Sequence, residues 1–177
     1  MPVDMKLMIA SAFVQLARKK PIDKITVKDL VEQCGISRQA FYYHFRDLLD
    51  VMEWSIRQMI QQALENSLRA ESPEKALEEF IRLGIEHHDL LVRLLASQRR
   101  FQVECMVVEA MRSSVRQMIY NKKPDLTVNF QDLEVALNFY AYGLTGVVLE
   151  NCRDANISAE QLAEKLYQVI SGRMLEV

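Results

Sequence analysis

Residues 26–45 read TVKDLVEQCGISRQAFYYHF, and this stretch decides the fold of the first part of the chain. Thr26 can cap a helix with its hydroxyl, and Asp29 follows three residues on, in the reciprocal position of a capping box. Gly35 can take the left-handed backbone conformation in which helices commonly end. Ser37 can cap the next helix. The stretch therefore predicts two short helices joined by a glycine turn, which is a helix-turn-helix.

The second helix of this pair has an apolar side and a side with polar and aromatic residues. Ala40, Phe41 and Phe45 fall on the inward side at helical spacing. The outward or rim residues are Arg38, Gln39, Tyr42, Tyr43 and His44. Arginine and glutamine match the hydrogen-bonding edges of bases, while tyrosine and histidine reach phosphates, so the pattern favours a helix that enters the DNA major groove. The alternative is an ordinary helical hairpin whose aromatic side chains pack on a neighbouring element.

The sequence GISRQAFYYHFRD at residues 35–47 resembles the recognition-helix signature of TetR/AcrR-type transcriptional regulators. The shared pattern is a glycine, an apolar residue, Ser, a basic residue, two variable positions, an aromatic pair and Phe. The preceding VEQCG and the first helix fit the same family, so the specific resemblance covers about the first third of the chain. It implies a dimeric, all-helical regulator with a small DNA-binding domain and a larger domain that senses a ligand and dimerises.

The chain departs from that family just after the signature. Such regulators commonly carry a Lys two or three residues after the Phe, where it meets a phosphate. Here Arg46 can substitute for that Lys, whereas Leu48 cannot, so DNA binding is expected to be weaker or to depend on another anchor. The residues that we expect to contact DNA are Thr26, Ser37, Arg38, Gln39, Tyr42, Tyr43, His44 and Arg46.

Length and composition favour an ordered helical protein. The chain has 177 residues, enough to bury a core, and half of them are hydrophobic, with only 5 Gly and 4 Pro. No apolar run reaches the length of a membrane span, and the first residues lack a secretory cleavage pattern. Together with the DNA-reading segment, this predicts a cytoplasmic protein. Cys34, Cys105 and Cys152 are widely spaced and odd in number, which indicates reduced thiols and neither a disulfide framework nor a zinc site.

Charge is distributed unevenly along the chain. The whole chain carries −2, but residues 1–50 hold eight basic and six acidic residues, which gives +2 there and −4 for the rest. This is the sign expected of a DNA-binding end on a neutral-to-acidic body.

Prolines, glycines and capping residues predict an all-α fold of about nine helices and no strand. Residues 1–47 are expected to form the helix-turn-helix DNA-binding domain, and residues 48–177 a helical domain that senses a ligand and dimerises. In the first helix, the predicted inward stripe is Leu7, Ala10, Phe13, Val14 and Ala17. The predicted helices are 4–19, 26–34, 37–45, 47 to about 69, roughly 74–87, 89–95, 97 or 98 to about 120, 129 or 132 to about 153, and 158 to about 173. Ser72 and Ser158 are expected to cap the fifth and the last of them. The helix at 47–69 is long enough to link the two domains as a lever.

The predicted eighth helix contains LEVALNFYAYGLTGVVLENC, which is apolar on nearly all sides. One side can face the chain's own core, and the other remains for a second copy, because small residues permit close helix approach. With the last helix, the expected dimer interface is Phe139, Tyr142, Gly143, Gly146, Leu162, Leu166, Val169 and Ile170. The alternative is a fully internal helix in a monomer. A dimer also presents two recognition helices to a pseudo-palindromic operator in double-stranded DNA.

A small-molecule pocket in the second domain is compatible with the composition, because such pockets are mostly apolar. The candidate lining residues are Phe80, Gly84, Phe101, Cys105, Val108, Met111, Phe130 and Tyr140. The same residues also suit a filled core. His87 and His88 are adjacent and point about 100° apart on a helix, so they do not form a metal site; no metal and no cofactor is expected.

The sequence predicts a DNA-binding transcriptional regulator, a repressor by family habit, whose operator binding responds to an unknown small-molecule effector. An enzyme would need a nucleophile with its base, a phosphate-binding loop or a cluster of metal ligands, and the sequence shows none of these. The alternative is a dimeric co-regulator or adaptor of the same fold that acts through a protein partner, with weak or no DNA binding of its own.

Overall fold

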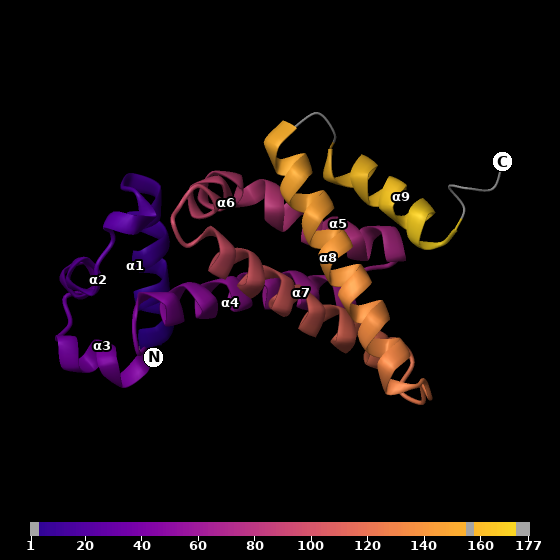
Figure 1. The fold of residues 1–177 in the computed structure, drawn as a ribbon, viewed down its shortest axis with the longest axis horizontal. Helices are drawn as coiled ribbons and strands as arrows, with labels where there is room; N and C mark the ends of the chain where they lie inside the picture. The colour runs from indigo at the N-terminus through magenta and orange to yellow at the C-terminus, as the bar shows by residue number, and fades with distance from the viewer. Residues whose placement is uncertain (1–3, 155–157, 173–177) are drawn as a thin grey trace. The chain divides into compact units, whose positions relative to one another are not determined.

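The computed structural model of the chain describes residues 4–154 and 158–172, and the side chains of residues 152–154 are outside this description. Within these residues the regular structure is helical and no strand occurs, so the all-α prediction is confirmed (Figure 1). The helices are α1 (Met5–Lys19), η1 (Ile22–Lys24), α2 (Val27–Cys34), α3 (Arg38–His44), α4 (Leu48–Leu68), α5 (Pro73–Glu86), α6 (His88–Leu95), α7 (Arg100–Lys122), α8 (Phe130–Asp154) and α9 (Ala159–Ile170). The last helix ends at Ile170, three residues before its predicted end, and Gly172 follows with a left-handed φ of 78°.

The chain divides into two compact units. The first comprises Met1–Gln58 and Asp89–Met106, and the second comprises Met59–His88 and Val107–Val177. Two helices, α4 and α7, therefore have residues in both units. The domain boundary that the sequence suggested, between residues 47 and 48, stays a prediction.

The first unit is built on α1, α2 and α3, drawn in indigo and violet in Figure 1. Asp4 caps α1, because its carboxylate accepts from the backbone N–H groups of Lys6 and Leu7 at 3.0 and 3.3 Å. The inward placement of Leu7 was wrong, since the residue is half exposed, and Ile9 is buried instead. Leu7 lies in the first turn, where α1 has fewer neighbours than along its middle. Phe13, Leu30 and Phe41 complete the centre of this unit and are almost fully buried, as are Ala10 and Ala17.

The capping box at the start of α2 is present as predicted. The Thr26 hydroxyl accepts from the Asp29 backbone N–H at 3.2 Å, and the Asp29 carboxylate accepts from both the N–H and the hydroxyl of Thr26 at 2.7 Å. The Lys20 ammonium lies 2.7 Å from the same carboxylate. The hydrogen bonds from Lys20 and Thr26 lower the pKa of Asp29 to about 2. This carboxylate therefore ties the end of α1 to the beginning of α2.

The turn between α2 and α3 depends on one glycine. Gly35 has a φ of 65°, in the left-handed region, and the N–H of Ile36 donates to the Val31 carbonyl at 3.0 Å. A side chain is strained in this conformation, whereas glycine adopts it freely. Ser37 then caps α3 by accepting from the Ala40 N–H at 3.1 Å. The helix-turn-helix predicted for residues 26–45 is thus formed.

In the same unit, the turn before α7 is attached to η1 because the Gln98 N–H donates to the Asp23 carboxylate at 3.2 Å.

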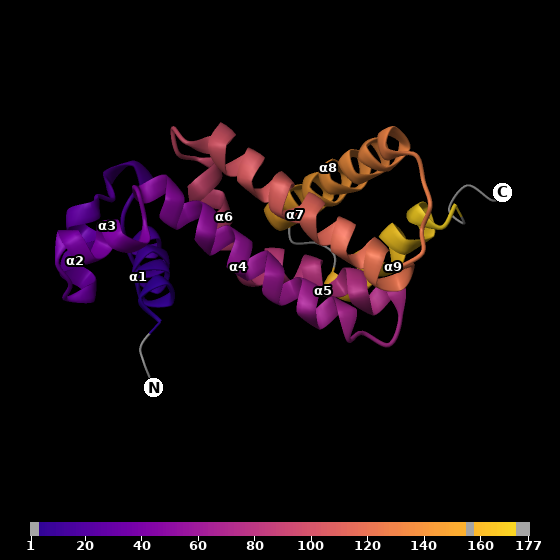
Figure 2. The same cartoon turned by 90° about the horizontal axis from the view of Figure 1, so that it is seen from below.

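The second unit is organised around α5. Ser72 caps this helix, with Pro73 in its first turn, and Ser158 with Gln161 forms the predicted capping box of α9. Along its length α5 packs on α9, and it also contacts α8 (Figure 2).

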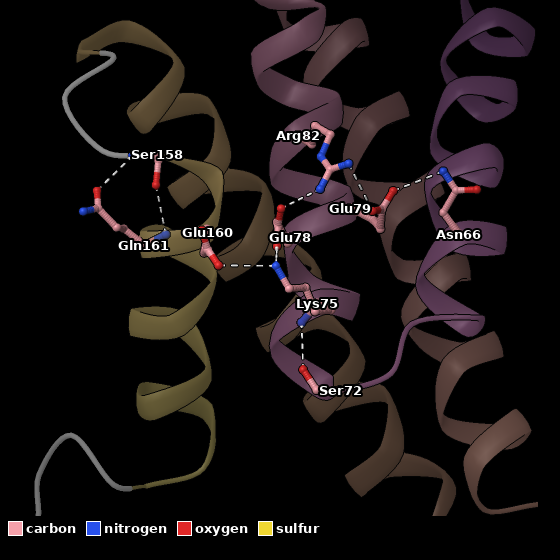
Figure 3. Close-up of polar contacts among 9 residues, drawn as sticks. All are labelled: Asn66, Ser72, Lys75, Glu78, Glu79, Arg82, Ser158, Glu160 and Gln161. Atoms are coloured by element: carbon pink, nitrogen blue, oxygen red, sulfur yellow. Dashed lines mark hydrogen bonds and ion pairs between the residues drawn. The ribbon is translucent and has the colours of Figure 1, made fainter.

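A chain of ion pairs crosses the second unit (Figure 3). At its centre the Glu78 carboxylate lies 2.8 Å from the Lys75 ammonium and 2.5 Å from the Arg82 guanidinium. Lys75 also reaches Glu160 of α9 at 3.4 Å. These cations, Lys75 foremost, lower the pKa of the largely buried Glu78 carboxyl. The network thus adds one exposed ion pair between α5 and α9 to their apolar packing.

We predict that the contribution of Asp29 to stability depends on pH. Its pKa is about 2 in the folded state and 3.8 ordinarily, so the stabilisation is fully present above about pH 3.8 and is lost as the pH falls through about 2. Asp29→Asn should lower the urea midpoint near neutral pH, and the difference from the parent should shrink over that window. Glu32→Gln is the control, because this exposed carboxylate of the same helix makes only a 3.7 Å ion pair with Lys28. A gap between parent and Asp29→Asn that is equal at all pH values would contradict the assignment.

Candidate functional site

The inward face of α3 fixes this helix to the first unit. Phe41 and Phe45 are almost fully buried, as predicted, and Ala40 is half-buried. The Phe41 ring meets Tyr42 edge to face at 5.3 Å between centroids, and Phe45 meets Trp54 of α4 in the same way at 6.0 Å. Aromatic contacts of this geometry add to the stabilisation from burial. The burial of Phe41 and the contact between Phe45 and Trp54 hold α3 by one side, so that its other side is free of the core.

The outward face of α3 carries the residues that the sequence singled out. Tyr43 is 86% exposed and Tyr42 is 55% exposed, values that are unusual for tyrosines within a folded unit. Arg38 and Gln39 are exposed as well, while His44 is half-buried and contacts the Tyr43 ring edge to face at 5.0 Å. The hydroxyls of Thr26 and Ser37 lie on the surface but already serve as helix caps. Whether these side chains contact DNA stays a prediction.

The start of α4 is acidic, and its two carboxylates accept backbone hydrogen bonds. The Asp47 carboxylate accepts from the Asp50 N–H at 2.9 Å, and the Asp50 carboxylate accepts from the Arg46 N–H at 2.9 Å. The first bond satisfies one free N–H group of the first helical turn, and the second holds Arg46, which precedes the helix. The Arg46 N–H foremost lowers the pKa of Asp50. Leu48 is 7% exposed, so the position where related regulators place a Lys points into the protein.

Lys6 of α1 supplies a positive charge near the start of α4, and nothing in the sequence pattern indicated this residue. Its ammonium lies 5.4 Å from the centre of the Phe45 ring, within the range of a cation–π contact. Its charge also acts on Asp50. Lys6 stands forty-odd residues before α4, and only the packing of α1 against α3 brings it near, so no local pattern in the sequence signals it.

The second unit contains a partly open apolar cavity of about 280 Å³. Phe80, Met111 and Tyr140 line it, as the sequence suggested. Gly84, Phe101, Cys105, Val108 and Phe130 are not among its lining residues. The interior position expected for Phe101 and Phe130 was wrong, since they are 74% and 70% exposed in the single chain. Both lie in the first turn of a helix, α7 or α8, where few elements surround them.

The remaining lining residues were not foreseen. Most of them belong to one face of α7, where lining residues recur three or four positions apart and could have been grouped from the sequence by this spacing. The full lining is Leu77, Phe80, Met111, Val115, Met118, Ile119, Lys122, Tyr140, Leu144 and Ile170.

One face of α8 is apolar and uncovered in the single chain. Phe139 and Tyr142 are 72% and 65% exposed, and Val135 nearby is also exposed. Gly143 and Gly146 lie on the surface, and a Cβ added at either would meet no other atom within 4 Å.

On α9, only part of the predicted interface is at the surface. Val169 and Ile170 are exposed and Leu166 is half-buried. The placement of Leu162 at the interface was wrong for the single chain, because this side chain is buried where α9 packs on α5.

The other candidate groups carry no site in the described part of the chain. His87 caps the end of α5 and His88 begins α6, as expected of a helix boundary. Within the described ranges, no group of three or more His, Cys, Asp or Glu could hold a metal ion. The Cys34 and Cys105 thiols are free, burial raises the pKa of Cys34, and the side chain of Cys152 lies outside the description. Among the helices described, none combines the length and apolar character needed to span a membrane.

Comparison with known proteins defines the class of protein. Residues 9–47 match the family described as "Bacterial regulatory proteins, tetR family", and residues 71–172 match that described as "Transcriptional regulator C-terminal region". The chain belongs to the TetR family of transcriptional regulators.

The chain is similar to one curated relative and to solved structures of the same fold. It is 30% identical over 97 residues to the uncharacterized HTH-type transcriptional regulator YerO of Bacillus subtilis (strain 168), a match that covers 49% of this chain and about a third (34%) of that protein. Lin0861 from Listeria innocua has a TM-score of 0.74 at 20% identity, covering 99% of this chain and 96% of that one. The dihydroxyacetone kinase operon activator DhaS has a TM-score of 0.69 at 16% identity, covering 97% and 96%. At these identities the two structures show a shared fold.

Proposed function

We propose that this regulator binds operator DNA as a homodimer through α3 and that a small molecule in the cavity of the second unit tunes its affinity. The observation that carries the proposal is the two-sided character of α3. Its Phe41 side is fully buried, and its Arg38 and Tyr43 side is open to solvent. A helix held in this way can lie in the major groove while it keeps its packing contacts with the rest of the protein.

The exposed side chains divide into two kinds of contact. Arg38 and Gln39 lie in the first turn of α3, where recognition helices place the residues that read base edges. Tyr42 and Tyr43 lie one turn later and can donate to phosphates, as can His44. Phosphate contacts fix the register of the protein, and base contacts select the sequence.

Lys6 and Arg46 serve in this proposal as the phosphate anchor that Leu48 cannot supply. The Arg46 side chain is 84% exposed and lies beside the Asp50 carboxylate. A nearby anion would repel a phosphate, and Lys6 offsets it because its charge acts on the same carboxylate. Lys6 and Arg46 together balance the charges of Asp47 and Asp50, so the two cations can meet a phosphate at a place that is neutral overall.

Dimerisation is supported by the uncovered face of α8. Phe139 and Tyr142 are large exposed apolar side chains, and Gly143 and Gly146 beside them permit close approach of a second helix. Large apolar patches on a single chain commonly mark protein interfaces. A twofold pair built on α8, with Val169 and Ile170 of α9, would present two copies of α3 to a pseudo-palindromic site.

Effector control would act through α4. This helix begins directly after the helix-turn-helix and continues into the second unit, so it belongs to both. A ligand that favours one arrangement of the helices around the cavity would tilt α4 and change the separation of the two recognition helices. We propose that DNA binding by this protein represses transcription. Activation is the alternative, because the chain is similar to DhaS, which is named an operon activator.

A second candidate is a co-regulator that acts through a protein partner with weak DNA binding of its own. The acidic start of α4 favours it, because Asp47 and Asp50 stand where a cation would meet phosphate. A gel shift at low salt with DNA selected from random sequence distinguishes the two. A shift that weakens as salt rises supports the regulator, and no shift at low salt supports the co-regulator.

Arg38→Ala and Tyr43→Ala should each weaken operator binding while the dimer persists. Loss of a base contact by Arg38 costs about 1–3 kcal/mol, which is roughly five- to 150-fold in affinity. Fluorescence anisotropy with the selected operator measures this, and sedimentation checks the dimer. Arg57→Ala is the matched control, because this exposed arginine of α4 pairs with Glu53 of its own helix at 2.9 Å. Parent-like affinity in both α3 variants would show that α3 does not read the operator.

Lys6→Gln should weaken binding to all DNA sequences alike and reduce the slope of log affinity against log salt by about 1. The reason is that one phosphate contact releases about one counterion. Lys19→Gln is the control, since this exposed lysine lies at the other end of α1, about 20 Å away along the helix. An unchanged slope in Lys6→Gln would remove Lys6 from the anchor.

Phe139→Glu should convert the dimer to a monomer and abolish cooperative binding of the two half-sites. A carboxylate buried between two apolar helices without a partner is strongly disfavoured. Sedimentation at several protein concentrations gives the readout, with Gln117→Glu of α7 as an exposed control that adds the same charge. If Phe139→Glu sediments as the parent does, the interface lies elsewhere.

A further inference from the structure

One face of α7 runs along the cavity and changes from apolar to cationic. Met111, Val115, Met118 and Lys122 follow each other at three- or four-residue spacing and all line the cavity. Eleven residues of α-helix span about 16 Å, so the stripe is elongated. Met111 and Val115 are buried, whereas Lys122 is exposed. The apolar end of the stripe is therefore buried, and its cationic end lies at the surface.

The opposite walls are hydrocarbon. Leu77 and Phe80 of α5 and Leu144 of α8 line them, with Ile170 of α9 close to the surface. The Tyr140 hydroxyl is the other polar side-chain group of the lining beside Lys122, and no lining residue is acidic. The volume of about 280 Å³ lies near the lower limit of ordinary ligand pockets, about 300 Å³.

The charge of Lys122 is available, as are those of Arg69, Lys123 and Lys165, but of these four cations Lys122 is the one that lines the cavity. Lys75 and Arg82 pair with Glu78, and Arg112 and Arg116 pair with Glu134. Within residues 4–154 and 158–172, no carboxylate pairs with Lys122. Lys122 is the last residue of α7, where a positive charge interacts favourably with the helix dipole. The dipole does not explain why this lysine closes an otherwise apolar cavity.

We propose that the cavity binds a single-chain carboxylate amphiphile, with the hydrocarbon chain along the α7 stripe and the carboxylate on Lys122. The inference deepens the proposed function, since it rests on the cavity being the effector site. A neutral hydrocarbon leaves the ammonium unpaired, and a cationic amphiphile is repelled by it. A carboxylate gives a charge-assisted hydrogen bond at the cationic end of the stripe, while its chain is removed from water by the methionines and aliphatic side chains.

The test compares three probes of equal chain length on the full-length protein, namely dodecanoate, dodecanol and dodecylamine, each below its micelle concentration. Isothermal titration calorimetry should give dodecanoate an affinity roughly tenfold or more above that of dodecanol, because the charge-assisted bond is made only by the acid. Dodecylamine should bind most weakly. Equal affinities for the acid and the alcohol, or no binding of dodecanoate, would overturn the proposal.

Two variants locate the head group. Lys122→Met should lower the affinity for dodecanoate to that for dodecanol, and Lys122→Glu should transfer the preference to dodecylamine. Both substitutions are at an exposed position and leave the apolar wall intact. Lys123→Met is the matched control, because the neighbouring lysine is not part of the lining. A Lys122→Met protein that still prefers the acid would refute the role of Lys122.

The outcome is separable from that of the proposed regulator. Binding is measured without DNA, so carboxylate binding with the predicted variant pattern supports the site even if operator affinity does not respond to dodecanoate. Conversely, operator binding without any dodecanoate binding overturns this inference and leaves DNA recognition by α3 in place.

Discussion

The exposed character of α3 depends on the burial of one side chain, Phe41. Burying an aromatic ring in the centre formed by α1 and α2 gives α3 a fixed rotation about its own axis. Residues 42 and 43 then have to point outward, because successive helical positions are about 100° apart. The left-handed turn at Gly35 sets where α3 begins, and Phe41 sets which side it shows. Any surface property of this helix follows from these two local constraints.

The carboxylates that follow the helix-turn-helix stabilise α4 but repel an approaching anion. Asp47 and Asp50 lie at the start of α4, where the Asp47 carboxylate accepts from the Asp50 N–H and where carboxylates are favoured. The same carboxylates oppose the approach of any anion. Lys6 on α1, remote in sequence, acts on one of them, Asp50, through space. In the proposed DNA complex, this lysine supplies from another helix the charge that the apolar Leu48 lacks.

Local signals explain most of what the sequence predicted. Thr26 with Asp29, Ser72, and Ser158 with Gln161 act on backbone groups within a few residues, so they mark helix ends without knowledge of the fold. Placements that depend on distant elements were less accurate. Leu162 was assigned outward by its pattern but is buried under α5, and Phe101 and Phe130 were assigned inward but lie in first turns with few neighbours. Lys6 could not be found, since only tertiary packing brings it to Phe45.

The division of α7 between the two units has a mechanical consequence. Its first residues, up to Met106, belong to the unit that contains the helix-turn-helix, and the turn just before it is attached to η1 by the bond from Gln98 to Asp23. An α-helix is stiff along its axis, because every turn is closed by hydrogen bonds. For the proposed effector control, α7 is thus a second continuous helix, in addition to α4, that has residues in both units.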